Sequence, residues 1–404
     1  MQVAHRIRFV TDSPTLAITA RAKKMKAEGK DVISLSIGEP DFPTPENIVN
    51  AAKIALDKGA TKYTPAAGIP ELREAVARTV AVSHELPGIT GEHVIVSSGA
   101  KHSIFNAMLA ILNPGDEVII PTPYWLSYPV MVTLASGIPV FVPTSLEERF
   151  VLSPEKLRAA ITRRTRMIIL NNPSNPTGTV YNRRELKALY DVIEDYPNVM
   201  VLSDDIYGKL IYGNGKFCSV AAFSDEARKR TIVIDGVSKS YAMTGWRIGF
   251  SVARRAVTKA MAHIQSHTTS NPTTVAQYAA LEALNGPQDA VEAMRDEFNV
   301  RRSFMLKQLA NVPGFEFHQP RGAFYVMPRV TNILGKITPA GDFLRNDVDV
   351  ANYLLDTALV ALVPGTPFGA PGHIRLSYAL NTEKLGLAID RIGEAVVALK
   401  DPGV

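Results

Sequence analysis

The chain has 404 residues, of which 46% are hydrophobic and 21% are charged, and its formal net charge is +5. This composition is typical of a soluble globular protein, and the length favours two domains. The lysines and arginines are scattered, so the sequence predicts no nucleic-acid partner and is better suited to anionic small ligands. The single cysteine, Cys218, excludes an internal disulfide and fits a reducing cytoplasm.

Neither a secretory leader nor a membrane span is expected from the sequence. Residues 1–10 lack the apolar core of a signal peptide, and no apolar run reaches the ~20 residues that a spanning helix needs. The histidines show no paired ligand spacing, so we expect no metal site. The sequence therefore predicts a cytoplasmic protein without a membrane partner.

Helices and short apolar runs alternate along most of the chain. Helices are predicted at residues 14–29 and 46–58, and another follows Pro70. The predicted strands lie at residues 94–97, 117–121, 139–143, 166–170, 199–203, 231–234 and 247–252. Seven short strands between helices predict an α/β fold with a mostly parallel sheet that helices cover on both faces.

The pattern changes after about residue 290. A long helix over residues 289–310 is followed by shorter predicted strands at residues 315–317, 323–326, 360–363 and 373–377, and a last helix follows Thr382. We therefore predict a large domain of residues 46–290 and a smaller α+β domain of residues 291–404. Residues 1–45 are expected to join the smaller domain.

Reactive side chains follow the predicted strands at the edge where ligands bind in parallel sheets. They are Lys101, Trp125, Asn175, Asp204, Tyr207, Lys239 and Arg247. A partly desolvated lysine is a nucleophile for a carbonyl carbon, and an acid can hold a protonated pyridine nitrogen. An arginine with the amides of a helix start can grip a phosphate, and a tryptophan can stack on a ring. Pyridoxal 5′-phosphate, linked to Lys239, satisfies all of these groups.

Several motifs resemble one family in the same order. Residues 238–249, Ser-Lys-Ser-Tyr-Ala-Met-Thr-Gly-Trp-Arg-Ile-Gly, resemble the cofactor-lysine signature of class-I aminotransferases, which are fold-type I pyridoxal-phosphate enzymes. Matching segments also occur at residues 38–45, 63–74, 172–178 and 204–207. The chain is most similar to the bacterial aspartate/prephenate aminotransferase subgroup.

The resemblance implies roles for individual residues. Lys239 would carry the cofactor and move protons, Asp204 would hold the ring nitrogen, and Tyr207 would contact the ring oxygen. The residues implied to bind the cofactor are Tyr63, Gly99, Ala100, Lys101, Trp125, Asn175, Asp204, Tyr207, Ser238, Lys239 and Arg247. Tyr63 would reach the phosphate of a neighbouring subunit, which implies a homodimer with shared active sites.

The resemblance also implies a substrate site. Arg375 would clamp the α-carboxylate of the substrate, and Gly38, Trp125 and Asn175 would line the pocket. Residues 265–270 contain no arginine for a side-chain carboxylate, so Lys101 and Thr15 are expected to bind it. L-Aspartate and 2-oxoglutarate are then the expected substrates of a ping-pong reaction.

The chain departs from the family pattern at three positions. Asp205 stands where many relatives have glutamate, and we expect it to point away from the cofactor. Gly236 stands where many have a serine that touches the phosphate. Thr11 stands where relatives active on prephenate have a basic residue, which makes prephenate a less favoured substrate.

Other functions remain open from the sequence. An aromatic amino acid or prephenate aminotransferase and a carbon–sulfur β-lyase would use the same lysine and arginine. A transcription regulator with this fold would need a DNA-binding domain before it, and about 30 residues precede the first motif here. An inactive relative is disfavoured because each implied catalytic position carries a competent residue.

Overall fold

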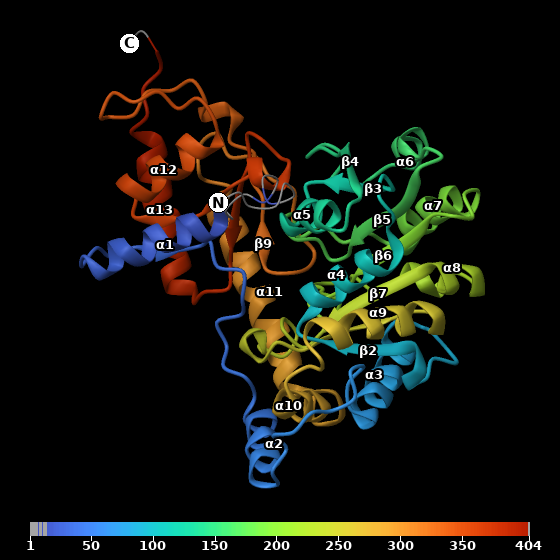
Figure 1. The fold of residues 1–404 in the computed structure, drawn as a ribbon. Coiled ribbons are helices and arrows are strands. Elements are labelled where there is room, and N and C mark those ends of the chain that lie inside the picture. The colour runs from blue at the N-terminus through green and yellow to red at the C-terminus, as the bar shows by residue number, and fades with distance from the viewer. Residues whose placement is uncertain (1–6, 8–9, 11–13, 403–404) are drawn as a thin grey trace, which may run out of the picture.

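A seven-stranded sheet forms the centre of the larger part of the molecule (Figure 1). The computed structural model describes Ile7, Val10 and residues 14–402. The strand order is β2-β8-β7-β6-β5-β3-β4. The strands are β2 (Val94–Ser97), β3 (Glu117–Thr122), β4 (Ile138–Pro143), β5 (Thr165–Asn171), β6 (Met200–Asp204), β7 (Thr231–Gly236) and β8 (Gly249–Val252). Only β8 runs antiparallel to its neighbours, so the predicted α/β fold with a mostly parallel sheet is confirmed.

The reversed direction of β8 places two key segments at one edge. Gly249, which begins β8, pairs with Gly236, which ends β7. Residues before β8 therefore lie beside residues after β7, and Arg247 and Lys239 meet at the carboxyl ends of the parallel strands. The strand predicted at residues 247–252 begins two residues later, because Arg247 has a left-handed φ of 57° that a β-strand does not accommodate.

Helices cover both faces of the sheet, as the continuous apolar strands require. On one face, Val118 and Ile120 pack with α4 (Ala100–Ile111) and α9 (Arg255–Thr268). On the other face, Ile119 packs with Leu189 of α7 (Arg183–Glu194). The remaining helices around the sheet are α2 (Glu46–Asp57), α3 (Pro70–Ser83), α5 (Ser127–Leu134), α6 (Pro154–Ala160), α8 (Asp225–Arg230) and α10 (Thr274–Asn285).

The C-terminal part is a separate layer of helices and short strands. It contains α11 (Asp289–Leu309), β9 (Tyr325–Val326), α12 (Asp347–Thr357), β10 (Val360–Ala361), β11 (Val363–Pro364), β12 (Ile374–Ser377) and α13 (Thr382–Val397). Strands β11, β12 and β9 form a small antiparallel sheet. Figure 1 shows α12 and α13 on one side of the molecule and the large sheet on the other, with α11 between them.

The N-terminal segment lies against this C-terminal part. Strand β1 (Ile33–Ser34) pairs with β10 in parallel. Helix α1 (Pro14–Ala27) buries Ala22 and Met25 against Leu355 of α12. The chain then crosses back to the large sheet, so residues 35–45 run past the edge where the parallel strands end.

Two of the shorter predicted strands differ in the structure. Residues 315–317 form only an isolated bridge between Glu316 and Arg329. The strand predicted at residues 360–363 is divided between β10 and β11, which belong to different sheets. In the described part of the chain, no helix combines the length and apolarity that crossing a membrane requires.

Candidate active site

A cavity of about 400 Å³ lies at the carboxyl ends of the parallel strands. This volume is in the range of small-molecule sites, about 300–1,000 Å³. Its walls come from both the large sheet and the C-terminal part. The lining residues are Gly38, Ala100, Lys101, Ile104, Trp125, Leu126, Ser127, Tyr128, Asn171, Asn175, Asp204, Ile206, Tyr207, Ser238, Lys239, Thr244, Arg247, Tyr325 and Arg375.

Most residues singled out from the sequence meet in this cavity. Those that line it are Gly38, Ala100, Lys101, Trp125, Asn175, Asp204, Tyr207, Ser238, Lys239, Arg247 and Arg375. Gly99 lies directly behind Arg247. Tyr63 does not line the cavity and is 88% exposed. Thr15 lies in α1, but its side chain is outside the described part, and Thr11 is outside the described residues altogether.

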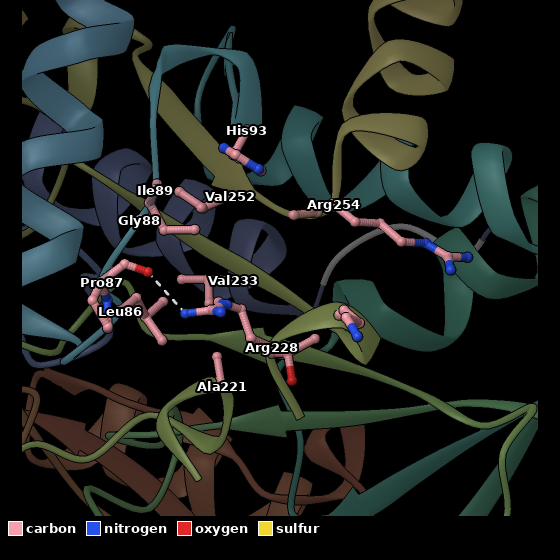
Figure 2. Close-up of a pocket in the computed structure, with 13 residues that line it drawn as sticks. Leu86, Pro87, Gly88, Ile89, His93, Ala221, Arg228, Val233, Val252 and Arg254 are labelled. Atoms are coloured by element: carbon pink, nitrogen blue, oxygen red, sulfur yellow. Dashed lines mark hydrogen bonds between the residues drawn. The ribbon is translucent and has the colours of Figure 1, made fainter. Parts of the chain in front are cut away.

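A second cavity, of about 160 Å³, lies at the opposite end of the strands (Figure 2). It is formed where β7 begins and β8 ends, with Val233 and Val252 in its wall. Arg228, at its rim, donates a hydrogen bond to the carbonyl oxygen of Pro87 at 2.8 Å. None of the candidate site residues lines this cavity. The predicted chemistry is therefore gathered at the first cavity.

Lys239 is held as a buried amine in the first cavity. It follows β7, and its Nζ donates a hydrogen bond to the carbonyl oxygen of Gly38 at 2.6 Å. Burial lowers the pKa of Lys239 from 10.5 to about 8. The Glu39 carboxylate raises this pKa and the Arg247 guanidinium lowers it further. A substantial fraction of the amine is neutral near pH 8, which a nucleophile or general base requires.

Asp204 ends β6 and points into the cavity as a buried acid. Its Oδ2 accepts a hydrogen bond from the Tyr128 hydroxyl at 2.5 Å. Burial raises the pKa of Asp204 from 3.8 to about 6, while the Tyr128 bond opposes this rise. The carboxyl is therefore ionised at neutral pH, and a buried carboxylate is stabilised by a cationic partner.

Arg375 has an unusual environment for a buried cation. It lies on β12, its Nη2 donates to the Ser36 carbonyl oxygen at 2.9 Å, and its Nη1 donates to Asn175 Oδ1 at 3.1 Å. Burial lowers the pKa of Arg375. Its Nε has no hydrogen-bond partner, and its two terminal nitrogens donate to uncharged oxygens of Asn175 and Ser36. A buried guanidinium in this state favours an anionic ligand.

Two tyrosines complete the wall between Lys239 and Arg375. The hydroxyls of Tyr207 and Tyr325 are 3.1 Å apart. The guanidinium carbon of Arg375 lies 4.5 Å from the centre of the Tyr325 ring. Tyr325 and Tyr128 were not singled out as site residues from the sequence. Tyr128 stands three residues after Trp125 in the same loop-to-helix segment, which was the available signal.

The start of α4 and Arg247 form a narrow anion cradle. Gly99 caps α4 with φ 89°, and a side chain there would meet Arg247 Nη2 at 2.5 Å. A side chain on Gly249 would meet the backbone nitrogen of Ala100 at 2.1 Å. Glycine is therefore required at both positions for the close approach. Backbone amides at a helix start and an adjacent guanidinium bind a phosphate well.

Lys101, the second residue of α4, adds a further cation to the cavity wall. Its Nζ lies 4.8 Å from the centre of the Trp125 ring, within range of a cation–π interaction. Burial lowers the pKa of Lys101, and the nearby Arg247 guanidinium lowers it further. The cavity thus contains separate positive groups near Trp125 and near Tyr325.

The departures at Asp205 and Gly236 have structural explanations. Asp205 does not line the cavity, and its Oδ1 accepts a hydrogen bond from Ser203 Oγ at 2.7 Å, so it points away as expected. A side chain on Gly236 would meet the Cα of Gly249 at 2.9 Å. The close packing of β7 on β8 therefore leaves no room for a serine at this position.

Comparisons with known proteins agree with this geometry. A family model described as "Aminotransferase class I and II" matches residues 30–392. An aspartate aminotransferase from Bacillus sp. (strain YM-2) is 46% identical and covers 98% of this chain and 99% of its own. An aspartate/prephenate aminotransferase from Nitrosomonas europaea is 44% identical, over 97% of this chain and 99% of its own.

Solved structures share the whole fold. The aspartate aminotransferase from Rhizobium meliloti matches with a TM-score of 0.96 at 43% identity, over 99% of this chain and 100% of its own. The aspartate aminotransferase from Thermus thermophilus with maleate matches with a TM-score of 0.91 at 42% identity, over 98% of this chain and 100% of its own. The predicted fold class is thus confirmed independently of the strand pattern.

Proposed function

Because the chain belongs to the class I and II aminotransferases, we propose that it moves an amino group from L-aspartate to 2-oxoglutarate by a ping-pong mechanism with pyridoxal 5′-phosphate. One observation carries the proposal. A buried lysine with a pKa of about 8 stands in one cavity with Asp204 and Arg375. This is the set of groups that amino-group transfer requires.

The residues of the cavity fit the cofactor. The cradle of Gly99, Gly249 and Arg247 suits its phosphate, since the start of α4 and the Arg247 guanidinium lie close together there. The Asp204 carboxylate suits the protonated ring nitrogen, and Trp125 offers a flat face for the ring. When bound, pyridoxal phosphate supplies an electron-withdrawing ring that stabilises negative charge at the α-carbon of the substrate.

Three side chains would orient the substrate and move its proton. Arg375, with Asn175 beside it, binds the α-carboxylate through paired hydrogen bonds. The neutral Nζ of Lys239 would take the proton from the α-carbon of the amino donor, and in the second half of the cycle it would give a proton to the α-carbon of the newly formed amino acid. Ser238 and Tyr207 complete the cofactor contacts that the family resemblance implies, with Tyr207 held by Tyr325.

The second carboxylate of aspartate would bind near Lys101. Lys101 lines the same cavity as Arg375, so a ligand with two carboxylates can engage both cations. The relative from Thermus thermophilus carries maleate, which is a dicarboxylate. The family resemblance implies that Thr15 also binds this carboxylate, and Gly38 lies beside Lys239 in the cavity wall.

Prephenate is a second candidate amino acceptor. The relative from Nitrosomonas europaea is named for both aspartate and prephenate. The absence of a basic residue at Thr11 favours aspartate with 2-oxoglutarate. Amino transfer to prephenate by the purified protein would establish the second activity. Neither the structure nor the relatives favour a carbon–sulfur β-lyase.

We also propose a cytoplasmic homodimer. Tyr63 is 88% exposed, which suits a side chain that reaches the phosphate site of a second copy. The proposed domains are residues 46–290 and residues 291–404. The pairing of β1 with β10 supports grouping residues 1–45 with the smaller one. The single cysteine supports a reducing compartment.

The test is transamination by the purified protein. We expect L-aspartate and 2-oxoglutarate to give oxaloacetate and glutamate, with pyridoxal phosphate present. Lys239→Ala should lose nearly all turnover because it removes both the cofactor linkage and the base. The exposed lysine variant Lys259→Ala is the control and should keep full activity. Turnover retained by Lys239→Ala would refute the mechanism.

A further inference from the structure

A second buried acid lies directly beside Asp204 in the sequence and is not used by the proposed mechanism. Asp205 has no exposed surface, and its Oδ2 lies 3.4 Å from Nε2 of His84. His84 is only 3% exposed and directly follows α3 as its C-cap, and its Nδ1 is 2.8 Å from Ser83 Oγ. Neither His84 Nε2 nor Asp205 Oδ2 has a hydrogen-bond partner in the described chain, so each has the other as its ion-pair neighbour. The two groups therefore depend on each other.

A third acid shares this region. The pKa of Asp235, on β7, is raised to about 7 by desolvation, and the His84 charge opposes this rise. The Asp205 carboxylate raises it further and Lys209 lowers it. Among the described residues, His84, Lys209 and Tyr241 lie near Asp235. Tyr128 and Cys218 lie near Asp205, and Arg183 contacts Cys218. His84 lies close to both Asp205 and Asp235.

This cluster acts on Asp204 through charge. After burial, the Asp205 carboxylate is the strongest influence that raises the pKa of Asp204, against the hydrogen bond from Tyr128. A proton on His84 would offset the negative charge of Asp205. Because two adjacent carboxylates disfavour each other's ionised form, a positive charge on the His84 ring, 3.4 Å from Asp205, would make the ionised Asp204 easier to maintain.

We propose that His84 is a positioning residue that acts through Asp205 to keep Asp204 ionised for the ring nitrogen of the cofactor. The inference rests on the proposed function, since it takes Asp204 as the partner of that nitrogen. His84 touches neither cofactor nor substrate, because it does not line the cavity. It couples the end of α3 to the end of β6 from behind the site.

The test is the pH dependence of ligand binding to the cofactor-free protein. The probe is 4′-deoxypyridoxine 5′-phosphate, which keeps the ring nitrogen and phosphate but cannot bond to Lys239. Its own ionisations are the same for every variant, so differences between variants report the protein. Affinity should fall at acidic pH as Asp204 takes up a proton.

At acidic pH the affinity profile falls, and we call this part its acidic limb. Two variants should shift the acidic limb along the pH axis in opposite directions. His84→Gln removes the positive charge, so the limb should shift to higher pH by about 0.5–1 unit. Asp205→Asn removes the negative charge, so the limb should shift to lower pH by a similar amount. The double variant should behave like Asp205→Asn alone, because His84 acts through Asp205. The exposed histidine variant His263→Gln is the control and should not move the limb.

The possible outcomes distinguish failure of the His84–Asp205 pair's role from failure of the proposed function. An unmoved limb in Asp205→Asn, or a limb that moves to lower pH in His84→Gln, would overturn the role of the pair. If His84→Gln does not fold, the near-isosteric Asp205→Asn decides alone. A purely structural role would lower the melting temperature of His84→Gln without moving the limb. Failure of the unmodified protein to bind the probe or pyridoxal phosphate would instead refute the proposed function.

Discussion

Arg375 donates a hydrogen bond to Asn175 across a separation of 200 residues in the chain, at 3.1 Å. Asn175 follows β5 of the large sheet, and Arg375 lies on β12 of the small sheet. The anion site that they form exists only where these two parts of the molecule meet. A ligand held by both side chains would therefore tie the two parts together.

The first prediction concerns the shared carboxylate of all amino-acid substrates. Arg375→Ala should lower kcat/KM for aspartate, alanine and aromatic amino acids alike, by on the order of 100-fold or more, because it removes a buried charge-assisted pair. Steady-state kinetics with each substrate measure this loss. The exposed Arg345→Ala should leave all of them unchanged. A loss confined to dicarboxylates would contradict the assignment of Arg375.

Replacing Lys101, unlike replacing Arg375, should affect only substrates with a second carboxylate. Lys101→Ala should lower kcat/KM for aspartate about 10–100-fold, since it removes a charged hydrogen-bond donor from the side-chain site. The value for alanine should change little, because alanine has no second carboxylate. The ratio of the two kcat/KM values is the readout. Equal losses for both substrates would mean that Lys101 serves the cofactor and not the substrate.

Close packing at the anion cradle gives a third prediction. Gly249→Ala places a Cβ 2.1 Å from the backbone nitrogen of Ala100, so the start of α4 must move. The affinity for pyridoxal phosphate should fall about tenfold or more, which corresponds to the 1–3 kcal/mol typical of overpacking. Gly245→Ala is the matched control, because nothing lies within 4 Å of a Cβ there. If the two variants bound pyridoxal phosphate with equal affinity, its phosphate would not bind at the start of α4.

The Asp204 carboxylate should lower the stability of the fold and raise its affinity for the cofactor. Its pKa is raised in the folded state from 3.8 to about 6. The ionised form is therefore unfavourable in the fold, and this penalty develops as pH rises from about 4 to 6 and is complete above it. Asp204→Asn should raise the unfolding free energy of the cofactor-free protein at pH 8, by up to about 3 kcal/mol.

The gain in Asp204→Asn should shrink as pH falls toward 4, and cofactor affinity should fall at every pH. Urea unfolding at pH 8 and pH 5 measures the first effect, and a cofactor titration measures the second. A variant less stable than the unmodified protein at pH 8 would show that Asp204 is not a strained buried charge.

Lys239, which loses its positive charge as pH rises, gives a further prediction about pH. The lowered pKa of Lys239, about 8, means that the amine loses its proton as pH rises through that value. The rate of covalent attachment of pyridoxal phosphate to the cofactor-free protein should rise with pH and level off above about 8. Stopped-flow absorbance measures this rate. A profile that keeps rising to pH 10 would indicate an amine that the site does not perturb.

Much of the fold and site follows from local patterns in the chain. The apolar runs before Asp204 and Lys239 predict buried strands, and reactive residues at their ends predict a ligand edge. The resemblance of residues 238–249 to class-I aminotransferases is confirmed by the family match over residues 30–392. These features are local because a strand and the residue after it are read from a few neighbouring positions.

Contacts between distant segments could not be predicted in the same way. The bonds of Tyr128 with Asp204 and of Tyr325 with Tyr207 join residues 76 and 118 positions apart. The pair of His84 with Asp205 depends on how the end of α3 packs behind β6. No periodicity carries this information, since each contact is set by the packing of whole elements.

The measurement that tests the central claim most directly is a half-reaction. The purified protein, loaded with pyridoxal phosphate, is given L-aspartate with no amino acceptor, and oxaloacetate is measured. A ping-pong aminotransferase should release oxaloacetate in an amount equal to the bound cofactor and then stop, and 2-oxoglutarate should restart the reaction. Absence of oxaloacetate from protein that has bound the cofactor at Lys239 would contradict aspartate as the amino donor.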